Sequence, residues 1–406
     1  MRFCFVTTFF PPEHFGGEAI FVAQLSNLLS RAGHEVHVVH CADSFRLLHN
    51  SVPPSRVWHD PAVRVHRFES PLGGLSPLAT YLTGRPFLKP ELRKILSHQF
   101  DVVHWHNFSL VAGPGAMQLV HPHSVQLCTT HDYWVVCPTS IRFRYDREVC
   151  TEQTCWRCSM SQGRPPQFWR ETNLMREAMQ RIDCIVAPSD YCRRVLIENG
   201  IDRDIAVLHH FYEPKPIDVE AQQGNYYFFA GRLEKHKGLQ TVLPLFTGGR
   251  HLLIAGAGNY EPELRRMAAR YPGVEFLGRI PHDQLPALYR HARATIVPSI
   301  CEETFGLTVL ESLQQGTPVV ASHFGALPEI VTLAGGGWVY RDFEECQQIL
   351  AHIDAHPAEA RLKGAQSRLD EFDQSLYLDR YLELVKRVRL ARQDGGGRAR
   401  SMAAAL

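Results

Sequence analysis

Short runs of apolar residues alternate along this chain with longer stretches in which apolar residues recur every three or four positions. Residues 2–9 (RFCFVTTF) are mostly apolar and predict a buried strand, and residues 34–41 (HEVHVVHC) predict the next one. Between them, residues 19–33 (AIFVAQLSNLLSRAG) show the helical period and end at a glycine, as helices often do. Repeated strand and helix units of this kind indicate a doubly wound parallel sheet.

The alternation continues through the chain and is interrupted once. Further strands of a first α/β domain, predicted at 1–210, have the sequences DVVHWH from Asp101, VQLCTTH from Val125 and CIVAPS from Cys184. Periodicity is lost over residues 211–224, which we interpret as a linker because two prolines there are incompatible with a helix. A second α/β domain, predicted at 225–375, has five strands with the sequences YYFFAG, HLLIAG, VEFLG, ATIVPS and PVVAS.

The end of the chain predicts one more element. Residues 376–392 predict a helix that packs back toward the first domain, and residues 393–406 (QDGGGRARSMAAAL) predict a flexible tail.

Composition narrows the class of protein without naming a partner. The 406 residues suffice for two cores, and 45% hydrophobic residues with a net charge of +1 argue against a disordered or nucleic-acid-binding protein. The N-terminal apolar stretch stops at Pro11 without a cleavage site, and no later stretch approaches the roughly 18 apolar residues of a membrane span. Eleven cysteines without an export signal predict reduced thiols and a cytoplasmic location.

Two carboxylates in residues 301–312 (CEETFGLTVLES) are the first candidate chemistry. Glu303 and Glu311 are eight positions apart, which is about 12 Å along a continuous helix. The paired carboxylates of glycosidases lie about 5 Å apart in retaining enzymes and about 6.5 to 9.5 Å apart in inverting enzymes. The two residues are therefore a poor hydrolytic pair.

A binding role fits this stretch better. If a helix starts near Thr304 to Gly306, Glu303 lies in the loop after the strand ATIVPS, where ligands of open α/β sheets bind. The free N–H groups of Thr304, Phe305 and Gly306 then suit a phosphate, and the two glutamates suit hydroxyl groups on either side of it. These features describe a nucleotide sugar. Alternatively, Glu311 is an ordinary residue of a helix surface.

A diphosphate requires cations, and the stretch GRLEKHKG after the strand YYFFA supplies Arg232 and Lys237. Gly16 and Gly17 lie in the turn between the first strand and helix, where backbone amides can approach a ligand. Each signal is weak alone, because a solvated loop explains the two cations equally well. IAGAGN at 254–259 lacks the third glycine of a dinucleotide fingerprint and predicts a tight turn.

Taken together, these stretches resemble the retaining glycosyltransferases of family 4. The patterns that carry the resemblance occur in the family's order: GGEAIFVAQLSNLLSRAGHEVHVV, DVVHWH, THD, GRLEKHKG, IAGAG, VEFLGRI, IVPSICEETFGLTVLESLQQGTPVVAS and GALPEIV. The resemblance covers nearly the whole chain, and its longest run, from Ile296 to Ser322, is highly specific. It implies the GT-B fold, in which two Rossmann-like domains with parallel sheets face each other across a cleft.

The resemblance also implies roles that spacing cannot give. Glu303 is implied to contact hydroxyls of the donor sugar and Glu311 those of the ribose. His131 of THD is implied to lie near the reaction centre, and Gly17 near the diphosphate. The side chains of Arg232 and Lys237 are implied to bind the diphosphate. The backbone groups of Thr304, Phe305 and Gly306 are implied to contact phosphate.

The implied reaction retains the anomeric configuration by front-face attack, without a catalytic metal or a side-chain base. The donor is a nucleotide diphosphate sugar, a UDP-sugar or GDP-sugar, and the acceptor is a glycan, a lipid-linked sugar or a small molecule, as in the synthesis of cell-surface polysaccharides. Rival interpretations are a GT-B nucleotide-sugar epimerase and a catalytically silent nucleotide- or carbohydrate-binding protein. A nicotinamide oxidoreductase is the weakest alternative. The chain departs from the family where HHFYEP, from His209, replaces the usual Asn-Gly-Val-Asp.

A cysteine- and arginine-rich excursion at 137–181 interrupts the first domain. Its thiols have a spacing compatible with a structural zinc site, although ordinary reduced cysteines explain them as well. The four are Cys137, Cys150, Cys155 and Cys158. The arginines and aromatic residues from Arg142 to Arg181 suit an anionic or lipid-linked acceptor, or peripheral contact with the inner face of a membrane; a solvated face is the alternative.

Overall fold

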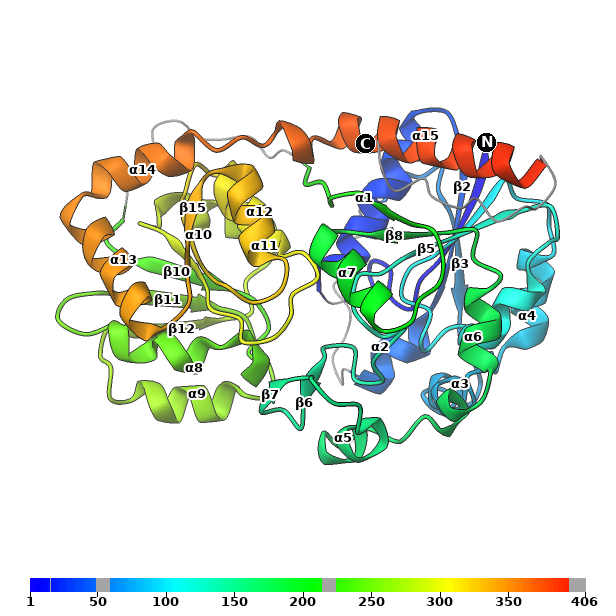
Figure 1. Cartoon of the computed structure of the whole chain (residues 1–406), viewed down its shortest axis with the longest axis horizontal. Coiled ribbons are helices and arrows are strands. Elements are labelled where there is room, and N and C mark those ends of the chain that lie inside the picture. The colour runs from blue at the N-terminus through cyan, green and yellow to red at the C-terminus, as the bar shows by residue number, and fades with distance from the viewer. Residues whose placement is uncertain (15, 49–58, 214–223, 394–406) are drawn as a thin grey trace. The chain divides into compact units, whose positions relative to one another are not determined.

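The computed structural model describes residues 1–14, 16–48, 59–213 and 224–393 (Figure 1). The chain folds into two compact units. The first comprises Met1–Ser140, Thr154–Phe211 and the chain from Gln374 onward, and the second comprises Ile141–Gln153 and Tyr212–Asp373. Of the predicted linker and tail, residues 214–223 and 394–406 lie outside the described residues.

The first unit is built on a seven-stranded parallel sheet with the order β3-β2-β1-β4-β5-β8-β9. Its strands are β1 (Arg2–Val6), β2 (Glu35–Cys41), β3 (Arg64–Phe68), β4 (Val102–Trp105), β5 (Val125–Thr129), β8 (Cys184–Ala187) and β9 (Ile205–Val207). Its helices are α1 (Gly17–Arg31), α2 (Ala42–Leu48), α3 (Leu75–Thr83), α4 (Lys89–Leu96), α5 (Cys155–Ser161), α6 (Leu174–Met179), α7 (Asp190–Glu198) and α15 (Gln374–Gln393), with 3-10 turns η1 (Pro114–Leu119) and η2 (Phe168–Glu171).

Strand β1 is apolar throughout because both faces of the sheet are covered. Cys4 and Val6 belong to the core on one face, whereas Phe3 and Phe5 belong to the core on the other, as the two-residue period of a strand requires. All four side chains are fully buried.

The second unit is built on a six-stranded parallel sheet with the order β12-β11-β10-β13-β14-β15. Its strands are β10 (Tyr227–Ala230), β11 (Leu252–Ala255), β12 (Val274–Gly278), β13 (Thr295–Val297), β14 (Val319–Ser322) and β15 (Gly337–Tyr340). Its helices are α8 (Leu239–Val242), α9 (Glu261–Ala268), α10 (Leu285–His291), α11 (Leu307–Gln314), α12 (Leu327–Ala334), α13 (Phe343–Ala355) and α14 (Pro357–Ala365), with 3-10 turns η3 (Lys235–Lys237), η4 (Leu243–Leu245) and η5 (Asp370–Phe372).

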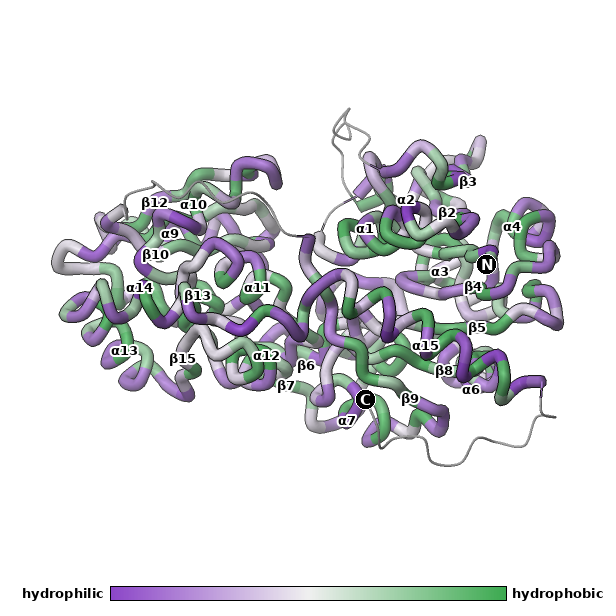
Figure 2. The backbone as a smooth tube through the Cα atoms, turned by 90° about the horizontal axis from the view of Figure 1, so that it is seen from above, coloured by the Kyte–Doolittle hydropathy of each residue, from purple (hydrophilic) through white to green (hydrophobic). Residues whose placement is uncertain are grey.

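Helix α15, drawn in orange to red, lies with the blue and cyan elements of the first unit (Figure 1). Its buried residues Tyr377, Tyr381, Leu384 and Val385 recur at helical spacing and join the core that contains Phe3. Figure 2 shows the resulting amphipathic pattern, in which purple and green segments alternate along α15 while β8 is mostly green. The end of the chain thus completes the core that its beginning forms.

Two features differ from the sequence predictions. Residues 137–181 were assigned wholly to the first domain, but Ile141–Gln153 pack in the second unit and form the antiparallel hairpin of β6 (Phe143–Arg144) and β7 (Glu148–Val149). The sequence analysis also missed β3, β9 and β15. All three are edge strands: polar residues interrupt the apolar ones of β3 (RVHRF), β9 has only three residues, and β15 starts at a glycine.

Across the described residues, no helix combines the length and the apolar character that crossing a bilayer requires.

The docking of α15 gives a first prediction. The Tyr381 hydroxyl lies 2.9 Å from Nδ1 of His104, whereas the Tyr377 hydroxyl, on the same helix and also buried, has no hydrogen-bond partner among the described residues. Tyr381→Phe should lower the free energy of unfolding by about 1–3 kcal/mol, because it leaves a buried ring nitrogen unsatisfied. Tyr377→Phe is the matched control and should be neutral or slightly stabilising. Denaturant unfolding measures both, and equal effects would contradict the prediction.

Candidate functional site

The strand order of the second sheet reverses between β10 and β13. The order runs outward in one direction from β10 and in the other from β13, so the connections after these two neighbouring strands lead toward opposite edges of the sheet. Ligands of open α/β sheets bind at such a reversal, outside the carboxyl ends of the strands. Arg232 and Lys237 follow β10, and Glu303 follows β13, so the topology brings together residues that are about 70 positions apart in the sequence.

Backbone contacts hold these loops against each other. The N–H of Ile300 donates to the carbonyl of His236 (2.9 Å), and the N–H of Ala326 donates to the carbonyl of Glu303 (2.8 Å). Gly238 has φ +72°, and a Cβ at this position would lie 1.8 Å from the carbonyl oxygen of Pro298. Glycine is therefore required for the loop with Lys237 to approach the loop with Glu303.

Glu303 and Lys237 form an ion pair. The Lys237 Nζ lies 2.6 Å from Oε1 of Glu303, and the Ser299 hydroxyl donates to the same oxygen at 2.6 Å. Burial alone would raise the pKa of Glu303, but the Lys237 charge and these hydrogen bonds outweigh burial and lower the pKa to about 2. Glu303 is therefore ionised at neutral pH and is a weak base, suited to accepting hydrogen bonds and to holding a positive charge.

Arg232 is exposed in the loop after β10. Its charge and those of Lys237 and Glu303 all act on the buried Cys301 thiol, whose pKa is raised mainly by burial, so the three charged groups lie near the same residue. The tight turn predicted at 254–259 supports this loop. A Cβ on Gly256 would lie 1.8 Å from the carbonyl oxygen of Gly231, and one on Gly258 would lie 2.4 Å from that of Leu233.

Helix α11 begins at Leu307, slightly later than the expected start between Thr304 and Gly306. Gly306 precedes it with φ +97°, a conformation that favours glycine. The Phe305 ring is buried and packs edge-on against Phe372, so its side chain is committed to the core. The N-terminus of α11 thus faces the same loop that carries Glu303.

Glu311 lies on α11 and is partly buried. Its Oε2 accepts a hydrogen bond from the buried Tyr289 hydroxyl at 2.6 Å. The carboxylate is therefore oriented by the protein, unlike that of an ordinary surface glutamate.

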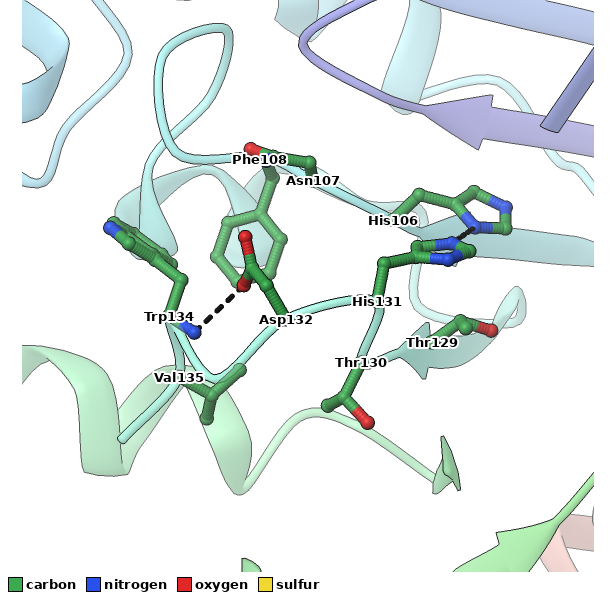
Figure 3. Close-up of a pocket in the computed structure, with 9 residues that line it drawn as sticks. All are labelled: His106, Asn107, Phe108, Thr129, Thr130, His131, Asp132, Trp134 and Val135. Atoms are coloured by element: carbon green, nitrogen blue, oxygen red, sulfur yellow. Dashed lines mark hydrogen bonds between the residues drawn. The ribbon is translucent and has the colours of Figure 1, made fainter. Parts of the chain in front are cut away.

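The predicted residues Gly17 and His131 belong to the first unit. Gly17 is the first residue of α1, which follows β1, and β1 and β4 are where the strand order of the first sheet reverses. A pocket lies at the carboxyl ends of β4 and β5 (Figure 3). It is lined by His106, Asn107, Phe108, Thr129, Thr130, His131, Asp132, Trp134 and Val135.

His131 is the middle member of a chain of three buried imidazoles. Its Nε2 lies 2.9 Å from Nδ1 of His106, which is drawn in Figure 3, and its Nδ1 lies 3.1 Å from Nε2 of His210. Both ring nitrogens of His131 are thus engaged, so its ring is fixed in orientation and would have to exchange one partner to bond a ligand. One feature of the sequence pointed to this arrangement: His210 lies in the HHFYEP stretch that departs from the family pattern.

Burial keeps these histidines neutral. It lowers the pKa of His131 to about 3, and burial together with neighbouring histidines lowers the pKa of His106 and His210 well below their ordinary value. In a chain of neutral imidazoles each ring donates once and accepts once, so the tautomers of the three rings are coupled.

Glu18, which the sequence analysis did not single out, contacts Asn107 of the pocket lining. Its Oε1 accepts hydrogen bonds from the N–H of Asn107 (3.0 Å) and the hydroxyl of Thr7 (3.3 Å). Burial and the charge of Asp132 raise the pKa of Glu18 to about 8. It follows Gly17 directly, but only the fold shows that it meets the loop after β4.

The four cysteines of the zinc prediction are divided between the two units. Cys137, Cys155 and Cys158 belong to the first unit and Cys150 to the second. Within the described parts of the chain, no three His, Cys, Asp or Glu side chains are placed to hold a metal ion. Structural zinc therefore stays a prediction, which metal analysis of the purified protein tests.

Two family models match consecutive parts of the chain. The model described as Glycosyltransferase Family 4 matches residues 15–215, and that described as Glycosyl transferases group 1 matches residues 213–356. The chain is 29% identical to a glycogen synthase of Mycobacterium tuberculosis over 416 residues, covering 92% of this chain and 91% of that protein. It is 34% identical over 149 residues, 35% of this chain and 39% of the relative, to a GDP-mannose-dependent alpha-(1-6)-phosphatidylinositol dimannoside mannosyltransferase of the same species.

Solved structures share the fold at low sequence identity. The sucrose-phosphate synthase of Thermosynechococcus elongatus superposes with a TM-score of 0.71 at 17% identity, covering 96% of this chain and all of that one. Anabaena Alr3699/HepE in complex with UDP gives a TM-score of 0.64 at 17% identity, covering 95% of this chain and all of that one. Two parallel-sheet units with these neighbours establish the GT-B fold.

The neutral histidine chain predicts a pH-dependent contribution to stability. Because the pKa of His131 is lower in the folded than in the unfolded chain, only the unfolded chain takes up a proton as pH falls below about 6.5. The free energy of unfolding of the wild type should therefore fall relative to that of His131→Gln, by up to about 1.4 kcal/mol per pH unit down to the folded pKa. Urea unfolding between pH 7 and 5 measures the difference.

The control for this prediction is His98→Gln, which replaces an exposed histidine of the same unit. A pH-independent difference between His131→Gln and the wild type, after the effect of this control is subtracted, would show that His131 is not held neutral.

Proposed function

The chain belongs to the glycosyltransferases of family 4, and from this premise we propose that it transfers a sugar from a nucleotide diphosphate sugar to a glycan, lipid-linked or small-molecule acceptor with retention of configuration. The observation that carries the proposal is the pairing of Lys237 with an ionised Glu303 at the strand-order reversal of the second sheet. This arrangement combines a fixed carboxylate, two cations and a helix N-terminus at the same edge of the sheet.

The donor diphosphate is proposed to lie between the two cations and the start of α11. Arg232 is exposed and available for bidentate contact with phosphate oxygens, and Lys237 supplies a point charge. The backbone N–H groups from Thr304 to Gly306 add donors at the positive end of the helix. A UDP-sugar or GDP-sugar is the proposed donor class, since one relative is named as GDP-mannose-dependent and one structural neighbour is a UDP complex.

The two glutamates are proposed to bind hydroxyl groups at the two ends of the donor. An ionised Glu303 accepts hydrogen bonds from the sugar hydroxyls, while its ion pair keeps the Lys237 ammonium beside the phosphates. Glu311, oriented by Tyr289, accepts from the ribose hydroxyls.

In the proposed reaction, the bond between the anomeric carbon and the phosphate oxygen breaks and a new bond to the acceptor oxygen forms on the same face. The acceptor proton passes to an oxygen of the leaving phosphate. Arg232 and Lys237 stabilise the negative charge that develops on the diphosphate, so neither a side-chain base nor a catalytic metal is required.

The acceptor is proposed to bind the first unit near the pocket of His131 and Asp132. The excursion that follows carries exposed apolar side chains among its arginines, including Trp156 (52% exposed) and Phe168 (69% exposed). Such a combination suits a lipid-linked acceptor and peripheral contact with the cytoplasmic face of a membrane.

Nucleotide binding is the first test of this proposal. At a nucleotide concentration of about 100 times the dissociation constant, binding stabilises the native state by about 2.7 kcal/mol, so UDP, GDP or ADP of the correct class should raise the melting temperature. Arg232→Ala should abolish the rise because the diphosphate loses a cation. Arg266→Ala, which removes an arginine that is 69% exposed on α9, should keep it. A thermal-shift titration with each nucleotide measures this, and no rise with any nucleotide would contradict the donor site.

An assay of sugar transfer distinguishes the role of Glu303 from that of Lys237. Glu303→Gln should reduce sugar transfer about 100-fold or more, because the sugar loses a charged acceptor near its reacting face. Nucleotide binding should be nearly unchanged, since Lys237 remains. Transfer at a near wild-type rate would remove the assigned role of Glu303. Turnover of the donor sugar without any acceptor would instead indicate an epimerase.

A further inference from the structure

The hairpin of β6 and β7 belongs by sequence to the first unit but packs in the second. Its flanking residues, Ser140 and Thr154, are in the first unit, while Ile141–Gln153 are in the second. Figure 1 shows the hairpin beside the ends of α8 and α9, elements of the second unit. A segment of 13 residues is thus tethered at both ends to one unit and folded into the other.

Arg142 anchors the hairpin to the loop that carries Glu303. Its Nε lies 2.6 Å from Oε2 of Glu302, and the two side chains are only 13% and 9% exposed. A second guanidinium nitrogen donates to the carbonyl of Cys150 at 3.2 Å, and the N–H of Cys150 donates to the carbonyl of Arg142 at 2.8 Å. The arginine therefore bridges both strands of the hairpin and a buried carboxylate.

The backbone of this segment is unusual. In the described residues, the non-glycine residues with positive φ are Ser140, directly before this segment, and Arg142, Tyr145 and Asp146 within it. Such conformations are unfavourable for residues with a side chain and persist where surrounding contacts enforce them, often at functional sites. Arg142 itself has φ +48°, so the residue that makes the ion pair is also a strained one.

The hairpin turn also lies near the loop after β10. The charge of Lys235 acts on the Asp146 carboxylate, and Asp146 acts in turn on Tyr260. Lys235 belongs to the same 3-10 turn as Lys237. The hairpin is therefore bonded to the loop after β13 through Arg142 and lies electrostatically close to the loop after β10 through Asp146.

We infer that Arg142 is a positioning residue of the donor site, which holds Glu302 so that the adjacent Glu303 meets Lys237 and Ser299. Neighbouring carboxylates of one loop are engaged from two sides, Glu302 by the hairpin and Glu303 by the loop after β10. Without Arg142, Glu302 would be a buried charge without its arginine, and the loop would shift to hydrate it. The inference rests on the proposed donor site, and it makes a segment of the N-terminal half part of that site.

Amide hydrogen exchange tests the positioning without relying on activity. In the full-length protein without ligand, Arg142→Ala should speed exchange in peptides covering Ser299–Gly306. The matched control is Arg144→Ala, which removes the same residue type from the same hairpin, where it pairs with the more exposed Glu148 and Glu152. Unchanged exchange in the 299–306 peptides of Arg142→Ala would overturn the inference.

Kinetics test the consequence for the reaction. Arg142→Ala should lower kcat/KM for the donor, by up to about 100-fold, since small displacements of positioned groups have effects of this size. Arg144→Ala should stay near wild type, and Arg142→Lys, which keeps the charge beside Glu302, should recover most of the activity. A melting temperature near that of the wild type shows that the variant is folded; where Arg142→Ala does not fold, Arg142→Lys and Glu302→Gln carry the comparison.

The outcomes of these experiments distinguish a failure of the positioning role of Arg142 from a failure of the proposed donor site. If the wild type binds neither UDP nor GDP, the donor site itself is wrong. If the wild type binds and transfers but Arg142→Ala keeps its kcat and KM, the donor site stands and the positioning role of Arg142 is wrong.

Discussion

The site depends on one constraint: parallel strands place all their carboxyl ends at the same edge of a sheet. In the second unit this edge collects the loops after β10, β13 and β14, and the strand order reverses between β10 and β13. The ion pair of Lys237 and Glu303 links the loops after these two strands. The close approach it requires exists because glycine occupies position 238, where a Cβ would collide with the backbone after β13.

Charge compensation explains why two consecutive glutamates are tolerated in a half-buried loop. Each buried carboxylate needs a cation and hydrogen bonds to offset the loss of water. Glu303 obtains them from Lys237 and Ser299, and Glu302 obtains them from Arg142. Since Lys237 also serves the proposed diphosphate, one cation links the sugar-facing carboxylate to the leaving group, and binding of the donor would redistribute its contacts.

Much of the fold could be predicted from the sequence because each buried strand of a doubly wound sheet is a short apolar run. The strands from β1 to β14 that lie inside the sheets were found in this way, whereas β3 was missed because polar residues interrupt its apolar ones. Candidate residues could be located in loops that follow strands, as for Lys237 and Glu303, which the structure brings together. Glu18 and Arg142 were not predictable, since their roles come from contacts with residues about 90 and 160 positions away.

The histidine chain and the hairpin show how this chain differs from a generic member of its family. Where the family carries Asn-Gly-Val-Asp, this chain carries His210, which occupies one nitrogen of His131 while His106 occupies the other. A histidine clamped by two neutral histidines is suited to shaping a pocket, because it has no nitrogen to spare without breaking a buried bond. In the proposed reaction, the charges that develop are therefore stabilised by the second unit, where the ionised carboxylates and their cations lie.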